Sequence, residues 1–211
     1  MTHPIHRRAL LSGGLALAAQ PALAASDSIV RVALKTTKGV VTLDLEVARA
    51  PITARNFLRY VDLGRFDASA FYRAARVAGA PQLGVIEGGL REDPAKLLPP
   101  IAHESTLVTG LSHKDGTISM ARHAPGTATA DFFICIGDQP TFDADVPTHD
   151  ADGGYAAFGQ VVDGMDLVRA ILAMPTSIYA RTAEMKGQML DPAVPILTAR
   201  RVARGLQASS L

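Results

Sequence analysis

The carboxylates and histidines of this chain do not have the spacing of a metal site. An acidic stretch near residue 150 offers the oxygen ligands that calcium takes, but neither Asp143 nor Asp150 is followed, twelve positions on, by an Asp or Glu that could close a calcium loop. Three histidines earlier in the chain also lack the spacing of metal ligands. We therefore interpret the stretch as a solvated loop and expect no metal or cofactor. The acidic stretch comprises Asp143, Asp145, His149, Asp150 and Asp152, and the histidines are His103, His113 and His123.

Two side chains are candidate nucleophiles. Cys135 is the only cysteine, so it cannot form an internal disulfide, and its neighbours Ile134 and Ile136 favour a buried, inert thiol. Ser112 follows Gly110 and Leu111, but the closing glycine of a nucleophile elbow is missing. Neither residue indicates nucleophilic catalysis.

The most informative stretch, residues 117–136, has the pattern of two buried strands separated by a loop of small residues. Phe132 and Ile134 fall on one face of the second strand and Phe133 and Cys135 on the other, because adjacent strand residues face opposite sides. The loop between the strands is rich in Ala, Gly and Thr, so the backbone of another chain can lie close against it.

The elements that position this stretch are short strands with two helices set between them. Pro51 is typical of a first helical position, and Asp163 is a candidate N-cap for the second helix. No element is assigned to residues 74–83, a small-residue insertion. Short strands with hairpin-length links predict a mainly β fold, a closed eight-stranded antiparallel barrel capped by two helices. Expected strands include 29–35, 40–47, 68–73, 85–89 and 194–202, and the helices run from Pro51 to Gly64 and over 163–172.

The first 24 residues have the pattern of a cleavable export signal. Arg7 and Arg8 precede an uncharged apolar run, and Ala22-Leu23-Ala24 is a small-x-small cleavage site. The arginine pair is loosely similar to a twin-arginine signal. We expect a periplasmic or otherwise exported protein that does not insert stably in a membrane, with residues 25–211 forming one domain.

The balance of charges excludes some partners. The whole chain has 21 Lys and Arg and 20 Asp and Glu. Removal of Arg7 and Arg8 with the leader leaves 19 bases against 20 acids, so the remaining chain has no basic excess with which to bind nucleic acid. No long exposed apolar stripe is evident, and we expect a monomer.

Five ordered blocks of the chain resemble the cyclophilins. The best are SMARHAPGTATADFFICI (119–136) and YAAFGQVVDGMD (155–166), and the supporting blocks are APITARNFLRYVDLGRFD (50–67), AFYR (70–73) and IEGG (86–89). The similarity spans roughly residues 29–203. It implies an eight-stranded barrel with two helices and peptidyl-prolyl cis–trans isomerase activity on proline-containing polypeptides.

The resemblance also assigns site residues. Arg73 falls on the catalytic arginine of the family, with Tyr72 in place of the usual histidine before it. Phe133 falls on the floor of the proline pocket. Ala121 and Arg122 fall on the strand end that pairs with the substrate backbone.

The remaining positions of the resemblance include several departures. Phe142 falls on an apolar wall, and Tyr155 on a position that is often His or Tyr. Glu87 and Asp131 stand where the family usually has glutamine, and Thr141 where a tryptophan is common. Leu83-Gly84 replaces a pocket aromatic, and the link between Arg73 and Glu87 is about six residues longer than usual.

Rotation about an X–Pro bond needs no nucleophile and no metal. Its barrier of about 18–20 kcal/mol comes from conjugation of the amide nitrogen, so a dry pocket for the ring and a donor aimed at that nitrogen suffice. A guanidinium suits the donor role because it is always charged and rigid. An isolated strand arginine is typical of a solvated surface, but the order of the blocks favours the site role for Arg73. Glu87 and Asp131 are equally consistent with exposed charges.

Three functions follow from these observations. The first is an isomerase that assists the folding of exported proteins, slowed by the two acids. The second is a chaperone that binds proline segments with little or no turnover. The third, a small-ligand barrel, is disfavoured because bulky apolar strand residues would fill the interior.

Overall fold

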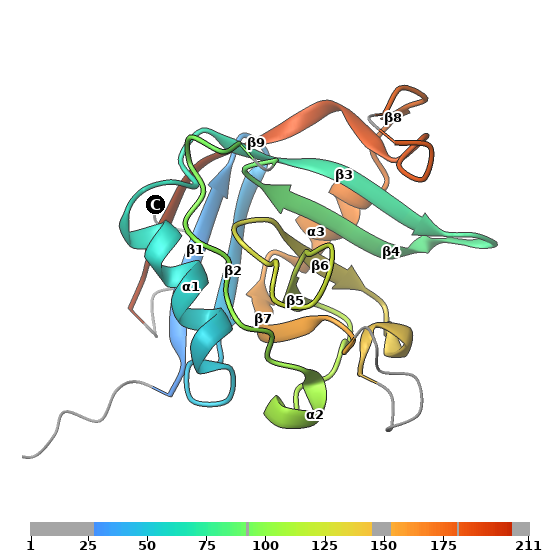
Figure 1. Ribbon diagram of the computed structural model, residues 1–211. Coiled ribbons are helices and arrows are strands. Elements are labelled where there is room, and N and C mark those ends of the chain that lie inside the picture. Colours follow the sequence, from blue (N-terminus) through green and yellow to red (C-terminus); the bar gives the residue numbers. More distant parts are fainter. Residues whose placement is uncertain (1–27, 92, 145–152, 181, 204–211) are drawn as a thin grey trace, which may run out of the picture.

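The chain folds into a closed antiparallel β-barrel (Figure 1). The computed structural model describes residues 28–91, 93–144, 153–180 and 182–203. Eight strands follow the order β1-β2-β7-β5-β6-β4-β3-β9, and pairing of β1 with β9 closes the ring, as predicted. The strands are β1 (Val30–Thr36), β2 (Gly39–Leu45), β3 (Ser69–Val77), β4 (Ala80–Gly89), β5 (Thr117–Met120), β6 (Phe132–Ile136), β7 (Ala156–Asp163) and β9 (Met189–Arg201), and the two-residue β8 (Thr176–Ser177) pairs with β9.

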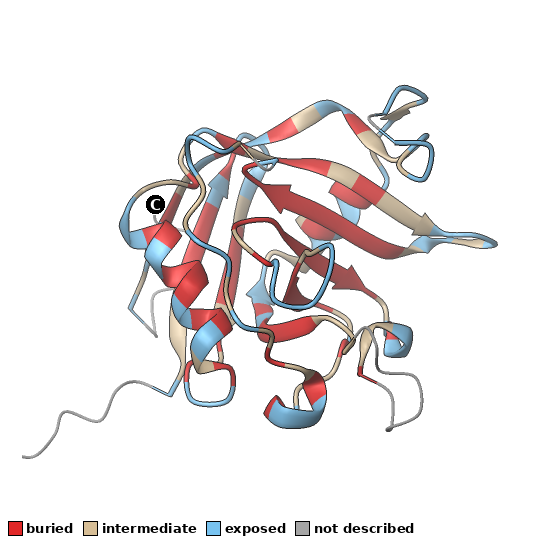
Figure 2. Cartoon of the chain, viewed as in Figure 1, coloured by how far each residue is buried: buried red, intermediate tan, exposed pale blue. Residues whose placement is uncertain are grey.

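Two amphipathic helices pack on the barrel. Helix α1 (Pro51–Asp62) begins at a proline and contacts β7 and β9, whereas α3 (Met165–Leu172) contacts β2, β3, β4 and β6. Each helix has buried and exposed residues, as Figure 2 shows for α1. The first turn of α1 is held by the buried Glu104, whose carboxylate accepts the N–H groups of Ile52 and Thr53 at 3.0 and 2.6 Å.

The predicted cap of the second helix is wrong. Asp163 ends β7 opposite Thr42, and the helix starts after Gly164. Gly164 has φ 88°, and a Cβ there would collide with the backbone of Val40. The turn from strand to helix therefore requires glycine, and the aspartate is displaced by one residue from the capping position.

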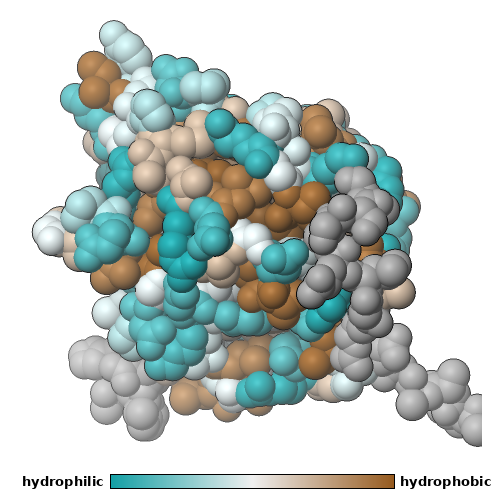
Figure 3. Space-filling view, turned by 180° about the vertical axis from the view of Figure 1, so that it is seen from behind, coloured by the Kyte–Doolittle hydropathy of each residue, from teal (hydrophilic) through white to brown (hydrophobic). Residues whose placement is uncertain are grey.

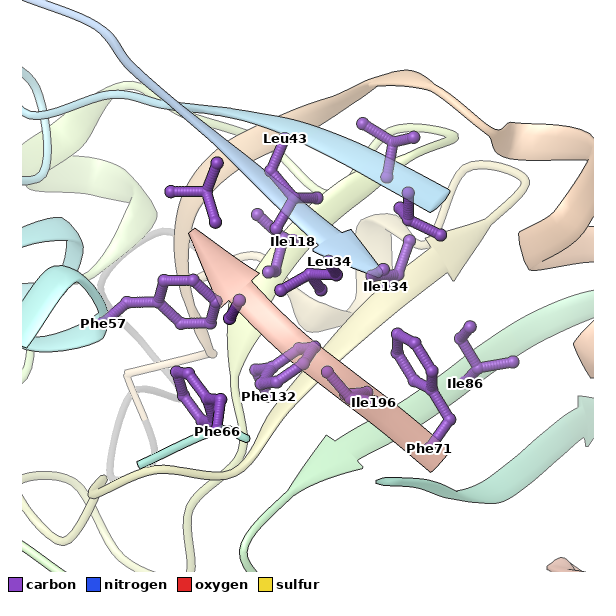
Figure 4. Packing of buried hydrophobic residues seen from close by; sticks show 14 of the residues in the cluster. Leu34, Leu43, Phe57, Phe66, Phe71, Ile86, Ile118, Phe132, Ile134 and Ile196 are labelled. Carbon is purple, nitrogen blue, oxygen red and sulfur yellow. The ribbon is translucent and has the colours of Figure 1, made fainter. Parts of the chain in front are cut away.

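Side chains fill the barrel interior (Figure 4). Aromatic rings from α1 and three strands meet there, with Phe57 and Phe132 edge to face at 5.3 Å between centroids. Phe132, Ile134 and Ile136 share one face of β6, as the alternation predicted, and the structure shows that this face points inward. The filled interior leaves no room for the ligand cavity of a small-ligand barrel.

The insertion at residues 74–83 is a continuation of a hairpin. It extends β3 to Val77 and starts β4 at Ala80, with Gly79 at φ 80° in the turn, so the paired strands project from the barrel (Figure 1). Small residues permit this pairing, since a Cβ at Gly84 would collide with the backbone of Ala75. The longer link between Arg73 and Glu87 thus forms an extended β3–β4 hairpin.

Two short elements complete the described chain, α2 (Thr106–Thr109) and a 3-10 turn, η1 (Pro140–Phe142). None of the described helices has the length and hydropathy needed to cross a membrane. The predicted leader, residues 1–24, lies outside the described residues.

Candidate active site

A cavity of about 620 Å³ opens on the outer face of the barrel, between strands β3, β4 and β6 and the loops that follow β5 and η1. Every residue that the sequence assigned to the site lines this cavity. These residues are Tyr72, Arg73, Glu87, Ala121, Arg122, Asp131, Phe133, Phe142 and Tyr155. Positions separated by up to 83 residues in the sequence are thus brought to one place.

Strand register explains how three of them meet. Arg73 on β3 is paired with Glu87 on β4, and Glu87 is paired with Phe133 on β6. Residues directly opposite each other in an antiparallel pair project from the same face of the sheet. The cation, the carboxylate and the aromatic ring therefore form one row across three neighbouring strands.

A β-bulge at Tyr72 gives this row its arginine. Phe71 is paired with Gly88 and Arg73 with Glu87, so Tyr72 is the extra residue of β3. Phe71 packs in the interior, whereas both Tyr72 and Arg73 line the cavity. In a regular strand Arg73 would point into the barrel with Phe71, so the bulge is what turns it outward.

The cavity floor is aromatic. The ring of Phe133 meets those of Phe142 and Tyr155 edge to face, at centroid distances of 5.5 and 5.3 Å. Val85 and Cys135 are buried beside it. Burial raises the pKa of the Cys135 thiol to about 12, so the thiol stays protonated and inert, as expected. The floor offers a dry, apolar surface of the kind that holds a proline ring.

The guanidinium of Arg73 is held at two points. Its Nη1 lies 2.7 Å from Glu87 Oε2, and its Nε donates to Oε1 of Gln188 at 2.8 Å. Within the described part of the chain, no hydrogen bond engages Nη2. The arginine side chain is 24% exposed, so it is both oriented and accessible. One face of a fixed cation is therefore left for a ligand.

Both departures from glutamine are buried, not exposed. Glu87 and Asp131 are 9% and 6% accessible. The hydroxyl of Tyr72 donates to Glu87 Oε1 at 2.8 Å, and the Arg91 N–H donates to Asp131 Oδ1 at 2.9 Å. Burial, together with the charges of Glu87 and Asp131, raises the pKa of Tyr72 far above its ordinary value. Tyr72 is thus a neutral donor that satisfies the carboxylate.

The end of β5 forms another wall. The Ala121 N–H donates to the Asp131 carbonyl at 2.9 Å, which extends the β5–β6 pairing by one residue. Arg122 Nε donates to the Gly154 carbonyl at 3.1 Å, and its guanidinium carbon lies 5.0 Å from the centroid of the Tyr155 ring. Arg122 thereby joins the loop after β5 to the start of β7.

A buried histidine lies behind the floor, and no sequence pattern indicated it. His113 is fully buried, and its ring stacks on Phe133 at 5.9 Å between centroids. Its Nδ1 lies 2.6 Å from Asp143 Oδ1, and its Nε2 lies 2.9 Å from Ser119 Oγ. Burial lowers the pKa of His113, although Asp143 opposes the shift. The Ser–His–Asp order is that of a catalytic triad, but Ser119 has no exposed surface and cannot attack a substrate.

A further wall of the cavity, formed by residues shortly before and at the start of β9, was not predicted from the sequence. Thr182, Met185 and Met189 line the cavity, and Gln188 from the same segment holds Arg73. Pairing of Arg73 with Met189 in the β3–β9 ladder brings this segment to the site from 115 residues away. No local pattern of the sequence could indicate a contact that depends on closure of the barrel.

The acidic stretch is only partly described. Asp143 accepts hydrogen bonds from Ser112 Oγ and the His113 N–H, at 2.7 and 2.9 Å. The other predicted members lie outside the described residues, namely Asp145, His149, Asp150 and Asp152. Among the residues that are described, no three His, Cys, Asp or Glu side chains are grouped so that they could hold a metal ion.

Comparison with known proteins is consistent with this geometry. Residues 31–198 match the family model for the cyclophilin-type peptidyl-prolyl cis-trans isomerases. A peptidyl-prolyl cis-trans isomerase of Acinetobacter baylyi is 34% identical over 178 residues, which is 83% of this chain and 86% of the relative. Peptidyl-prolyl cis-trans isomerase A of Dickeya dadantii is 35% identical over 159 residues, 74% of this chain and 77% of the relative.

Solved structures share the fold. A cyclophilin-type isomerase of Cryptosporidium parvum, crystallised in the presence of the dipeptide Ala-Pro, superposes with a TM-score of 0.63 at 19% identity. The similarity covers 82% of this chain and 99% of that one. At this identity the likeness concerns the barrel and its topology.

Proposed function

The chain belongs to the cyclophilin-type peptidyl-prolyl cis-trans isomerases, and from that premise we propose that Arg73 catalyses the rotation of X–Pro bonds held in the cavity. The ring of the proline rests on Phe133, Phe142 and Val85. The guanidinium of Arg73 donates to the prolyl nitrogen as conjugation is lost and the nitrogen becomes pyramidal. No covalent bond is made or broken, and no residue changes its protonation state.

One observation supports this proposal above the others. Arg73 and Phe133 lie on the same cross-strand row, and Arg73 is fixed by Glu87 and Gln188 while its Nη2 is left without a hydrogen bond to the described residues. A donor that is positioned before the substrate arrives does not have to be ordered during the reaction. The row therefore supplies both requirements of the chemistry, a dry pocket and an aimed donor.

The size of the effect can be bounded. A hydrogen bond to a charged group contributes about 1.5–3 kcal/mol, and each 1.36 kcal/mol is about tenfold in rate. Arg73 thus accounts for roughly ten- to a hundredfold of the acceleration. Any further acceleration must come from binding the twisted bond more tightly than either planar isomer in a site that excludes water.

The test is a protease-coupled assay of cis–trans isomerisation. We expect Arg73→Ala to lower kcat/KM by about ten- to a hundredfold while peptide affinity changes much less, because the donor acts in the transition state. Arg55→Ala is the matched control, since Arg55 is an exposed arginine of α1 that does not line the cavity. Equal activity of the wild type and Arg73→Ala would remove Arg73 from the mechanism.

A second candidate function is a chaperone that binds proline segments with little turnover. The ion pair between Arg73 and Glu87 favours it, because a carboxylate at 2.7 Å offsets the charge that the reaction uses. Peptide binding without rate enhancement in the same assay would select this candidate.

We also propose that the isomerase acts on exported proteins as a monomer. Support for export is the pattern of residues 1–24, and sequencing the amino terminus of the mature protein would check it. On the face shown in Figure 3, apolar areas are broken up by hydrophilic side chains, a surface that does not demand a partner. A dimer in size-exclusion chromatography with light scattering would contradict the monomer.

A further inference from the structure

The cavity holds a cation that the isomerase chemistry does not use, Arg91. The other arginines of the cavity are engaged, since Arg73 pairs with Glu87 and both Arg76 and Arg122 donate to backbone carbonyls. The Arg91 side chain is exposed, and no carboxylate of the described residues lies within 4.0 Å of its guanidinium. Among the described residues, no carboxylate therefore forms an ion pair with this guanidinium.

The backbone of Arg91 has an unusual conformation. Arg91 has φ 53°, a left-handed conformation that residues other than glycine rarely adopt. The conformation is fixed by the bond from its N–H to Asp131 Oδ1 at 2.9 Å. Gly89, two residues earlier, has φ 134°, and Asp131 occupies the space that a Cβ there would need. Strain of this kind at a cavity wall points to a role for the residue that carries it.

The side chain is oriented as well. The guanidinium carbon of Arg91 lies 5.0 Å from the centroid of the Tyr72 ring, and the Tyr72 hydroxyl is anchored on Glu87. A guanidinium that lies over an aromatic ring keeps N–H groups available, and those groups match a carboxylate in a two-pronged geometry. The position of Arg91 is therefore compatible with binding a carboxylate.

We propose that Arg91 binds an acidic side chain of the peptide, one or two residues from the proline, and that the enzyme therefore prefers X–Pro bonds in acidic segments. The inference rests on the proposed function, because it requires a peptide in the cavity. Tyr72 adjoins Arg73, which acts on the prolyl nitrogen, and an extended peptide advances about 3.3 Å per residue. A side chain that reaches the guanidinium over Tyr72 hence belongs to a residue close to the proline.

The experiment compares matched proline peptides that carry Glu, Gln or Lys at each position within two residues of the proline. For at least one position, we expect kcat/KM to be about two- to fivefold higher for Glu than for Lys, mainly through KM, as befits an exposed ion pair. Near 1 M salt, where the Debye length is about 3 Å, the difference should disappear.

Variants of Arg91 decide whether this residue is the cause. Arg91→Gln should abolish the preference, Arg91→Glu should reverse it, and Arg91→Lys should retain part of it. Arg55→Gln, which removes an exposed charge outside the cavity, should leave it unchanged. Equal kcat/KM for Glu and Lys peptides, or a preference that persists in Arg91→Gln, would overturn the inference.

Calorimetric titration of the same peptides separates this inference from the proposed function. If the wild type accelerates no peptide but still binds the Glu peptides more tightly than the Lys peptides, only the proposed function fails. If the affinities for the two series are equal, the role of Arg91 is excluded whatever the turnover.

Discussion

At the scale of single residues, the decisive contact is between Arg73 and Glu87. The carboxylate orients the guanidinium but also neutralises part of its charge, and the neutral hydroxyl of Tyr72 holds the other oxygen of the carboxylate. An amide at this position could still accept from Tyr72 and Arg73 without cancelling the cation. Orientation and charge are thus two separable effects of one side chain.

Replacing Glu87 by glutamine should raise activity. We expect kcat/KM of Glu87→Gln to increase by about two- to fivefold in the protease-coupled assay, because the ion pair with Glu87, worth up to roughly 1 kcal/mol when partly exposed, no longer competes with the substrate for Arg73. Asp44→Asn is the control, since Asp44 pairs with Arg31 outside the cavity and should have no effect on rate. A loss of activity in Glu87→Gln would show that orientation by the carboxylate outweighs the charge it removes.

At the scale of elements, α1 depends on a residue from a distant loop. Glu104 accepts the N–H groups of Ile52 and Thr53, which no residue of the helix itself can satisfy. A buried carboxylate also complements the positive end of the helix dipole. The loop before α2 and the helix are therefore stabilised together.

Loss of this carboxylate should destabilise the protein. Glu104→Ala should lower the free energy of unfolding by about 1–3 kcal/mol, the cost of leaving buried donors without a partner, as measured by urea denaturation. Asp166→Asn removes the fully exposed acid in the first turn of α3 and should destabilise the protein much less. Equal losses in the two variants would mean that burial of Glu104 contributes nothing.

At the scale of the whole molecule, the buried pair of His113 and Asp143 links stability to pH. Burial lowers the pKa of His113 in the folded protein, so the unfolded chain binds this proton more readily. The contribution of His113 to stability is therefore fully present above the ordinary histidine pKa. It is lost as the pH falls through the lowered pKa of the folded protein. The pKa of Asp143 is also lowered, because hydrogen bonds from Ser112 and His113 outweigh the opposing effect of burial. The contribution of Asp143 to stability is therefore lost only at a lower pH than that of His113.

The free energy of unfolding should therefore decrease as the pH falls below about 6.5, by at most about 1.4 kcal/mol per pH unit for one proton. Urea denaturation at several pH values measures the slope. In His113→Gln the slope over this range should become shallower, even if the variant is less stable at every pH. A slope that His113→Gln leaves unchanged would assign the effect to other groups.

The barrel and the site were predictable to different depths. Alternation predicted that Phe132 and Phe133 lie on opposite faces of one strand, and the resemblance of the ordered blocks predicted that Arg73, Glu87 and Asp131 line one cavity. The roles of these residues stay predictions. The contacts of Gln188 and His113 were not predicted, because they depend on strand pairing and burial that no local pattern encodes.

Errors at element ends have a similar physical origin. Asp163 has the chemistry of a helix cap, but the strand before it keeps its pairing with β2 for one residue longer, and Gly164 makes the turn. The insertion at 74–83 carries no alternation, yet its first residues extend β3 and pair with β4. Tertiary pairing overrides local preference at both places.

Pairing of the first strand with the last closes the barrel. Val32 is paired with Arg201, and the Val202 N–H donates to the Arg31 carbonyl at 3.0 Å, so the two ends of the barrel are adjacent. A short linker across this seam would allow the chain to be circularly permuted, with new termini at the exposed tip between β3 and β4. Such a rearranged chain would carry a fused partner protein directly at the rim of the cavity rather than on the far side of the seam.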